Sequence, residues 1–236
     1  MRYWLVMPAA GASLRFGGHG PKQLSSLTGR TVMEMALQPF VADERCQAIA
    51  LALSASALND TALRSRLSSK IVAIAGGAQR CDSVQQGLHA LASRAAADDW
   101  VLVHDAARPC LSQRDLDRLL AAGATHESGA LLAAPVIDTL KARDAAGTSE
   151  RTVDRSTLWR ALTPQMFRFD SLRAALHQAQ ISGRVPTDEA QAMEWQGERP
   201  LLVTAMDSNI KITHQEDLVL AAAIFAARDA ARGMQS

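Results

Sequence analysis

Residues 3–23 read YWLVMPAAGASLRFGGHGPKQ, an apolar run followed by a loop that contains several glycines. The run Tyr3–Met7 predicts a buried strand, and a glycine-bearing loop after a first strand is typical of α/β proteins that bind phosphate groups. Residue identity excludes two familiar versions of this loop. The dinucleotide fingerprint needs glycine in place of Ser13 and glycine or alanine in place of Phe16, and a P-loop needs Gly-Lys-Ser/Thr where this chain has Pro21-Lys22-Gln23. The loop therefore predicts an anion site of another kind.

The alternation of β-rich runs with helical patterns continues along the 236 residues, enough for one large domain over residues 1–236. Helix starts are predicted at Thr31, at Asp82 or Ser83, and at Ser112, because short polar side chains cap helices. An Ala-rich helix is expected over Gln215–Arg232. The pattern predicts an α/β, Rossmann-like fold whose mostly parallel sheet carries helices on both faces. The other buried strands are expected at Ala48–Leu53, Ile71–Ala75, Trp100–His104, Ala130–Ala134 and Leu201–Thr204.

One region, residues 135–159, interrupts this alternation. Its alternating segments Ile137–Lys141 and Glu150–Val153 flank the turn-like stretch Asp144–Ser149, which is a hairpin pattern. The hairpin has little apolar surface of its own, and isolated hairpins are marginal in water. We expect a protruding arm that a second subunit covers; a mobile surface excursion is the alternative.

The overall charge gives no reason to expect a nucleic acid or a membrane surface as partner. The chain has 25 Lys and Arg against 24 Asp and Glu, a formal net charge of +1, so any anion site must be local. Three scattered cysteines without CxxC spacing favour a reducing, cytoplasmic compartment. No stretch approaches the roughly 20 apolar residues of a membrane span, and the apolar run that ends at Met7 is short for a signal peptide.

The first loop holds two candidate phosphate-binding cations, Arg15 and Lys22. Its small residues Ala9 to Ser13 would let backbone N–H groups approach an anion, and on a wrapping loop both cations could reach one polyphosphate. The alternative is that they are ordinary solvated charges.

Two further strand ends carry residues suited to the same ligand. The segment AGGAQRCDSV (75–84) places Gly76-Gly77 after a strand and then Arg80 and Ser83, either a base or phosphate site or a plain turn. The segment VLVHDAARPC (101–110) ends a buried strand near Asp105, a fair Mg²⁺ ligand because Mg²⁺ is commonly held by one or two carboxylates and phosphate oxygens. A capping aspartate or one paired with Arg108 is the alternative. His104 is expected to be a packed strand residue.

A last candidate cation lies near the end of the chain. The segment DSNIKIT (207–213) places Lys211 inside a short apolar strand. Lysine is costly to bury without a partner, so an anion is expected beside it, unless the strand is an exposed edge.

Taken together, these motifs resemble the 2-C-methyl-D-erythritol 4-phosphate cytidylyltransferase family. The resemblance covers nearly the whole chain, and runs such as VHDAARP are long and specific. The matching segments are PAAG and PKQ within 8–23, GG..R.DSV at 76–84, VLVHDAARPC at 101–110, APV.DT.K at 134–141, TVDR..LW.ALTPQ.F at 152–167, TDEA at 187–190 and NIK.T at 209–213.

The resemblance implies transfer of CMP from CTP to methylerythritol phosphate, with Mg²⁺ as cofactor and release of pyrophosphate, in non-mevalonate isoprenoid biosynthesis. It also implies a homodimer through the arm at 135–159. The CTP contacts implied by position are Ala9, Ala10, Gly11, Gly77, Arg80, Ser83, Asp105 and Ala106, with Asp105 as the metal ligand. The implied catalytic cations are Arg15, Lys22 and Lys211, and the implied acceptor contacts are Thr139, Arg155, Thr163 and Thr187, with Arg155 serving the neighbouring subunit.

The attacking phosphate is already an anion, so such a reaction needs positioned cations and no general base. The chain departs from the family pattern at Ser13, Leu14 and Ala78. Three alternatives remain: a cytidylyltransferase for another polyol phosphate such as ribitol phosphate, a non-catalytic nucleotide-binding module, and a Rossmann dehydrogenase. The loop residues Ser13 and Phe16 disfavour the dehydrogenase, and the presence of Arg15 and Lys22 argues against the non-catalytic module.

Overall fold

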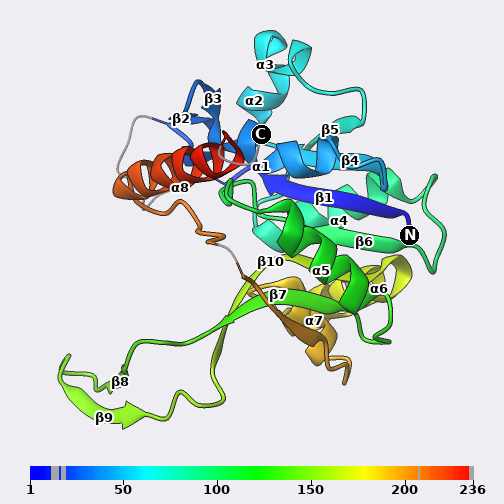
Figure 1. Cartoon of the computed structure of the whole chain (residues 1–236). Coiled ribbons are helices and arrows are strands. Elements are labelled where there is room, and N and C mark those ends of the chain that lie inside the picture. The colour runs from blue at the N-terminus through cyan, green and yellow to red at the C-terminus, as the bar shows by residue number, and fades with distance from the viewer. Residues whose placement is uncertain (12–15, 17–19, 207, 234–236) are drawn as a thin grey trace.

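The structure is a computed structural model that describes residues 1–11, 16, 20–206 and 208–233. Its centre is a seven-stranded sheet in the order β11-β7-β10-β6-β1-β4-β5 (Figure 1). Neighbouring strands run parallel except at β10, which is antiparallel to both β6 and β7. The predicted mostly parallel sheet is confirmed. The strands are β1 (Tyr3–Ala9), β4 (Cys46–Leu53), β5 (Ile71–Ala75), β6 (Trp100–Val103), β7 (Ala130–Pro135), β10 (Trp159–Arg168) and β11 (Leu201–Thr204).

Helices cover both faces of this sheet, as predicted. Strand β1 shows how, because Leu5 and Met7 join one apolar cluster while Val6, on the opposite face, joins another. The first cluster is covered by α1 (Val32–Val41) and α5 (Gln113–Gly123), and the second by α4 (Arg80–Leu91), α6 (Phe169–Ile181) and α7 (Glu189–Glu194).

Two strands predicted to be buried are the edges of the sheet. Strand β5 is only half-buried, and in β11 Leu201 is 37% and Leu202 45% exposed. An edge strand has a neighbour on one side only, so its apolar side chains are covered less than those of a central strand. An apolar run in the sequence indicates a strand, but not its place in the sheet.

Strand β10 was not predicted from the sequence, and its run contains Pro164. Proline removes a ladder hydrogen bond and argues against a central strand. Here the ladder to β7 is interrupted between Ala161 and Gln165, so the proline lies where no ladder bond is needed. The same interruption contains Thr163, one of the implied acceptor contacts.

Two of the three predicted helix starts are confirmed. Thr31 caps α1 through a capping box with Glu34, and Ser112 caps α5. The start predicted at Asp82 or Ser83 is wrong, because α4 begins at Arg80 after Gln79. The Asp82 carboxylate accepts a hydrogen bond from the Gln79 N–H, 3.0 Å away, so this acidic residue lies one turn inside the helix.

The remaining elements are short, apart from the C-terminal helix α8 (Glu216–Gly233), predicted over Gln215–Arg232. This helix packs with Phe16, Leu27 and Met35 in a third apolar cluster. No helix among the described residues is long and apolar enough to cross a membrane. The short elements are η1 (Lys22–Leu24), β2 (Ser26–Leu27), β3 (Arg30–Thr31), α2 (Ala55–Asn59) and α3 (Thr61–Ser65).

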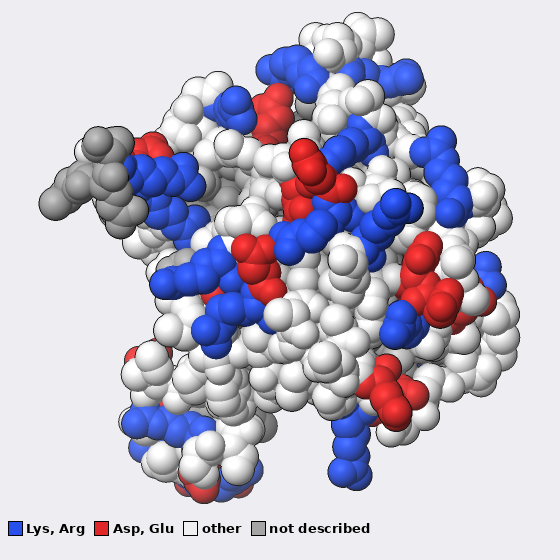
Figure 2. Space-filling model, turned by 45° about the vertical axis from the view of Figure 1, so that its right-hand side comes forward, with Lys and Arg blue, Asp and Glu red and all other residues white. Residues whose placement is uncertain are grey.

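The predicted hairpin is present and projects away from the body of the molecule (Figure 1). It consists of β8 (Leu140–Arg143) and β9 (Ser149–Val153), paired antiparallel. The first strand begins at Leu140, three residues later than expected, and Ile137 before it is 76% exposed. Figure 2 shows positive and negative side chains intermingled over the visible face, in keeping with the net charge near zero.

Candidate active site

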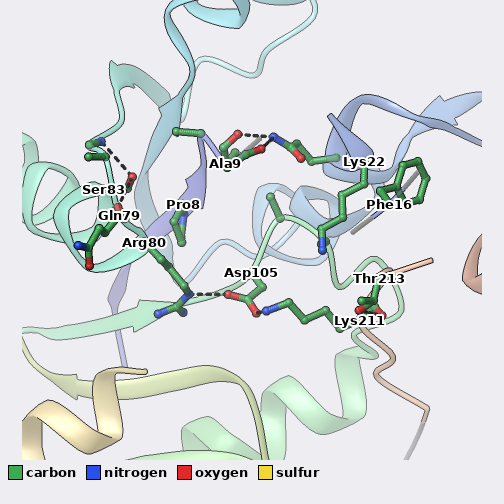
Figure 3. A pocket seen from close by; sticks show the side chains of 17 residues that line it. Pro8, Ala9, Phe16, Lys22, Gln79, Arg80, Ser83, Asp105, Lys211 and Thr213 are labelled. Atoms are coloured by element: carbon green, nitrogen blue, oxygen red, sulfur yellow. Dashed lines mark hydrogen bonds and ion pairs between the residues drawn. The ribbon is translucent and has the colours of Figure 1, made fainter. Parts of the chain in front are cut away.

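The loops that follow β1, β5 and β6 meet at the carboxyl edge of the sheet and enclose a pocket of about 390 Å³ (Figure 3). Ligands of open α/β sheets bind at this edge. Ten of the residues assigned from the sequence line the pocket: Ala9, Ala10, Gly11, Lys22, Gly77, Arg80, Ser83, Asp105, Ala106 and Lys211. The prediction for Arg15 falls outside the described residues, as do the departures at Ser13 and Leu14.

Gln23 holds the two ends of the first loop together. Its side-chain amide donates to the carbonyl oxygens of Ala9 at 2.7 Å and Gly11 at 3.1 Å, and the residue is 5% exposed. The neighbouring Lys22 points into the pocket (Figure 3). The sequence alone gives no role to Gln23, whose buried amide fixes the start of the segment that carries Lys22.

The opposite wall is built on Gly76 and Gly77. A Cβ on Gly76 would lie 2.4 Å from the Cβ of Ala10, so a glycine is required where the two loops touch. The hydroxyl of Ser83 accepts from the Gly77 N–H at 3.1 Å and donates to the Gln79 carbonyl at 3.2 Å. Ser83, which the resemblance implies as a CTP contact, thus holds the turn between Gly77 and Gln79 in place.

The floor of the pocket is a row of alternating charges centred on Asp105. Its Oδ1 accepts from Arg80 Nε at 2.9 Å and its Oδ2 from Lys211 Nζ at 2.8 Å (Figure 3). Arg108 adds a third cation, with Nε 3.7 Å from Oδ2. On its far side Arg80 grips both carboxylate oxygens of the buried Glu189, at 2.7 and 2.9 Å.

These contacts set the protonation state of the floor. Burial raises the pKa of Asp105, but the charges of Arg80 and Lys211 outweigh it and hold that pKa well below its usual range. Asp105 is therefore ionised at neutral pH. Burial raises the pKa of Glu189, and Arg80 opposes that shift.

The prediction that Lys211 lies in a strand is wrong. The residue lies in an extended loop after β11, which is fastened where Ile212 donates its N–H to the Ala107 carbonyl at 2.8 Å. The Lys211 side chain is 40% exposed rather than buried, and it pairs with the anionic Asp105 at 2.8 Å.

Thr163 lies behind Asp105, where the β10 ladder is interrupted. Its hydroxyl oxygen accepts from the Asp105 N–H at 3.1 Å and lies 3.0 Å from His104 Nδ1. His104 Nε2 lies 3.0 Å from the Arg108 carbonyl, which can only accept, so Nε2 carries the proton and Nδ1 accepts from Thr163. Burial lowers the pKa of His104 to about 4, which keeps the ring neutral.

The C-terminal helix ties the loops of the floor together. The Asp217 carboxylate accepts from the N–H groups of Thr213 at 2.7 Å and His214 at 2.8 Å. Arg228 donates to the Cys110 carbonyl at 2.9 Å, on the loop that follows Asp105. Helix α8 thereby fixes the two segments that carry Asp105 and Lys211.

None of the four acceptor candidates is among the residues that line the pocket, and Thr163 is buried behind Asp105. Thr139 and Arg155 are exposed on the projecting arm, where Arg155 donates to the Ile137 carbonyl, and Thr187 is exposed just before α7. Because the arm extends away from the body, this subunit's pocket is not completed by its own arm (Figure 1).

A family model described as 2-C-methyl-D-erythritol 4-phosphate cytidylyltransferase matches residues 3–227. The chain belongs to this family. A family member from Acidithiobacillus ferrooxidans is 48% identical over 232 residues, which cover 96% of this chain and 98% of that protein. One from Pseudomonas putida is 45% identical over 217 residues, covering 92% of each chain.

Solved structures agree with this assignment of family. The crystal structure of a 4-diphosphocytidyl-2C-methyl-D-erythritol synthase superimposes with a TM-score of 0.81 at 32% identity, covering 95% of this chain and 98% of that one. The Francisella tularensis 2-C-methyl-D-erythritol 4-phosphate cytidylyltransferase gives a TM-score of 0.81 at 31% identity, covering 95% and 100%.

Two buried residues behind the pocket were not predicted from the sequence. Glu189, in the TDEA segment, is 1% exposed and bound to Arg80. The one local signal for Glu189 is an acidic residue at the start of an apolar helix. This signal does not reveal that its partner is Arg80, 109 positions away. Asn209 was also missed; its amide donates to the Thr163 carbonyl at 2.6 Å.

Asp105 is the one carboxylate among the described residues that line the pocket, and these residues contain no cluster of three metal-ligating side chains. A single carboxylate suits Mg²⁺ when phosphate oxygens and waters supply the other ligands. Both oxygens of Asp105 already accept hydrogen bonds from cationic side chains. The residue therefore fits as one Mg²⁺ ligand beside a triphosphate, in exchange for one of these contacts.

Proposed function

We propose that this chain transfers CMP from CTP to 2-C-methyl-D-erythritol 4-phosphate, forming 4-diphosphocytidyl-2-C-methyl-D-erythritol and pyrophosphate, in non-mevalonate isoprenoid precursor biosynthesis. The observation that carries the proposal is the match of residues 3–227 to that family, together with a pocket lined by ten of the assigned residues. The match over residues 3–227 favours this acceptor over another polyol phosphate such as ribitol phosphate. It also disfavours a dehydrogenase and a non-catalytic nucleotide-binding module.

The proposed division of the pocket follows its walls. CTP lies between the loop of Ala9 to Gly11 and the turn of Gly76 and Gly77, whose small residues let backbone groups approach the ligand. Lys22 from one wall and Lys211 from the floor supply charge to the triphosphate, with Arg15 as the third cation of the proposal. Arg80, Ser83, Asp105 and Ala106 complete the nucleotide site.

The chemistry that these residues support is electrostatic. The acceptor phosphate is an anion that attacks the α-phosphorus of CTP, another anion, so the barrier lies in bringing them together in line. Lys22 and Lys211 stabilise the negative charge that develops there. Mg²⁺ bound to Asp105 and the triphosphate would neutralise further charge on the phosphate oxygens.

The arm belongs to the same proposal. We infer a single domain over residues 1–236 that forms a homodimer through residues 135–159, with Thr139 and Arg155 reaching the acceptor in the partner's site. Thr163 and Thr187 contact the acceptor from within the chain. The guanidinium of Arg155 suits a phosphate because its planar fork binds two oxygens at once. A cytoplasmic location completes the proposal.

Release of pyrophosphate tests the reaction. Purified protein with CTP, methylerythritol phosphate and Mg²⁺ should release one pyrophosphate per product formed, with little release when ribitol phosphate replaces the acceptor. Chelation of the metal should abolish turnover. Equal or greater activity with ribitol phosphate would assign the chain to the other acceptor.

Mixing two inactive variants tests the shared site. Heterodimers of Arg155→Ala and Lys22→Ala subunits contain one site with both an intact Lys22 and an intact partner Arg155, so activity should return on mixing. Subunit exchange is verified independently by mass spectrometry. Exchange without recovery of activity would show that Arg155 does not act across the interface.

A further inference from the structure

Glu189 is a buried acid that does not line the nucleotide pocket but contacts Arg80, which does. It is 1% exposed in the first turn of α7, and its two carboxylate oxygens accept from the two terminal nitrogens of Arg80 at 2.7 and 2.9 Å. Burying a charge is costly unless the charge is paired, and this bidentate pairing supplies what the burial requires.

The grip of Glu189 fixes the plane of the Arg80 guanidinium. Arginine has five N–H donors in a rigid fork, and three of them are used here, two by Glu189 and the Nε–H by Asp105 at 2.9 Å. With its far edge held by Glu189, the guanidinium presents only its Nε edge to Asp105. Asp105 Oδ2 is thereby left to Lys211.

The helix start that carries Glu189 is held in place by the side chains of Asp188 and Gln165. Asp188 caps α7 by accepting from the Gln191 N–H at 2.9 Å, and Gln165 on β10 donates to the other oxygen of Asp188 at 2.9 Å. The side-chain oxygen Oε1 of Gln165 also accepts from the Ala190 N–H at 2.8 Å. Glu189 therefore extends from a rigid helix start, two residues after Thr187.

We propose that Glu189 is a positioning residue that holds Arg80 edge-on to Asp105 and so orients the charged floor of the nucleotide pocket. The proposal deepens the function proposed above and rests on it. A row of contacts, Glu189–Arg80–Asp105–Lys211, then joins the segment of Thr187 on the acceptor side to the cation on the nucleotide side.

The test begins with Glu189→Gln, which keeps the shape and removes the charge. The new amide turns a donor toward Arg80, so the bidentate grip is lost and the guanidinium is free to shift toward Asp105. We expect kcat/KM for CTP to fall by roughly 10- to 100-fold, the range found when groups that orient site ligands are removed. Glu194→Gln, an exposed change on the same helix, is the matched control and should behave as wild type.

A double-mutant cycle separates positioning from a merely structural role. If Glu189 acts through Arg80, adding Glu189→Gln to Arg80→Met should lower kcat/KM less than twofold beyond Arg80→Met alone. This comparison also carries the test if Glu189→Gln alone fails to fold, because removing both partners leaves no unpaired buried charge. A further loss of tenfold or more in the Arg80→Met background would overturn the proposal.

The affinity for CTP, measured by calorimetry without acceptor, provides a second readout. Glu189→Gln should weaken CTP binding while Glu194→Gln does not. A folded Glu189→Gln protein with a lowered melting temperature but wild-type kcat/KM and CTP affinity would show a purely structural pair and overturn the proposal. Wild-type protein that binds CTP but releases no pyrophosphate with methylerythritol phosphate would refute the proposed function instead. The positioning role of Glu189 would then be tested by the CTP affinities of the two variants alone.

Discussion

Replacing Thr163 by valine should destabilise the protein although the two side chains have nearly the same shape. The Thr163 hydroxyl serves two buried groups, since it accepts from the Asp105 N–H and donates to His104 Nδ1. The residue is 4% exposed and His104 is fully buried, so water does not replace the lost partner. Valine leaves both groups unsatisfied.

The magnitude follows from these two groups. Each buried polar group left without a partner costs about 1–3 kcal/mol, or about 2–6 kcal/mol for the pair. Removing the hydroxyl also removes its own desolvation cost, about 1–3 kcal/mol, so we expect a net loss of about 1–3 kcal/mol. For a domain of this size that loss corresponds to a fall in melting temperature of roughly 2–12 °C.

The assay is urea denaturation at pH 7, with Thr163→Ser as the decisive comparison. Serine keeps the hydroxyl and loses one methyl group, about 0.8 kcal/mol of burial, so it should be more stable than the valine variant. Thr125→Val, an exposed position, should stay within about 0.5 kcal/mol of wild type. Hydrophobic burial alone predicts the opposite order. A valine variant as stable as wild type, or more stable than the serine variant, would refute the hydrogen-bonded chain.

Three further predictions concern charge and selectivity. Lys22→Ala should lower kcat by about 10²–10³ with little change in melting temperature, because the residue points into the pocket; near-normal turnover would show that its charge is unused. Burial holds the pKa of His104 at about 4, whereas a histidine in the unfolded chain has a pKa of about 6.5. Between about pH 4 and about pH 6.5 the unfolded chain therefore binds more protons than the folded one. Stability should therefore fall as pH drops from about 6.5 to about 4, by about 3 kcal/mol from this group, and an NMR titration placing His104 above pH 6 would contradict it. The enzyme should prefer CTP strongly over ATP, because the pocket of about 390 Å³ is walled by touching loops; comparable kcat/KM values for the two nucleotides would contradict this.

The parts of the fold that could be predicted are those determined by residues that are close together in the sequence. The run of Tyr3–Met7 and the caps at Thr31 and Ser112 carry their signal within a few positions. The start of α4 was misplaced because Asp82 serves as the acidic member of a capping box one turn into the helix. Strands β5 and β11 were correctly found but wrongly called buried, since their place at the sheet edges depends on the whole topology.

In the candidate site, too, single residues could be predicted from the sequence, but their partners could not. Charges such as Arg80, Asp105 and Lys211 could be named from the sequence because each follows a strand or a recognisable motif. Their pairing could not, because Lys211 reaches Asp105 across 106 positions and Arg80 reaches Glu189 across 109. The sheet order brings the loops of Arg80 and Asp105 to one edge, and helix α8 with the hydrogen bond from Ile212 to Ala107 brings Lys211 to them.

The acids of the site serve to orient its cations, and this is what the proposed reaction requires. Asp105 is ionised and holds Arg80 and Lys211, while Glu189 holds Arg80 from the other side. His104, which could suggest a general base beside Asp105, is fully buried with both ring nitrogens in hydrogen bonds and is neutral at pH 7. It has no free position from which to take a proton from a substrate. An acceptor that attacks through an existing phosphate anion has no proton to give up, so fixed charges take the place of acid–base catalysis.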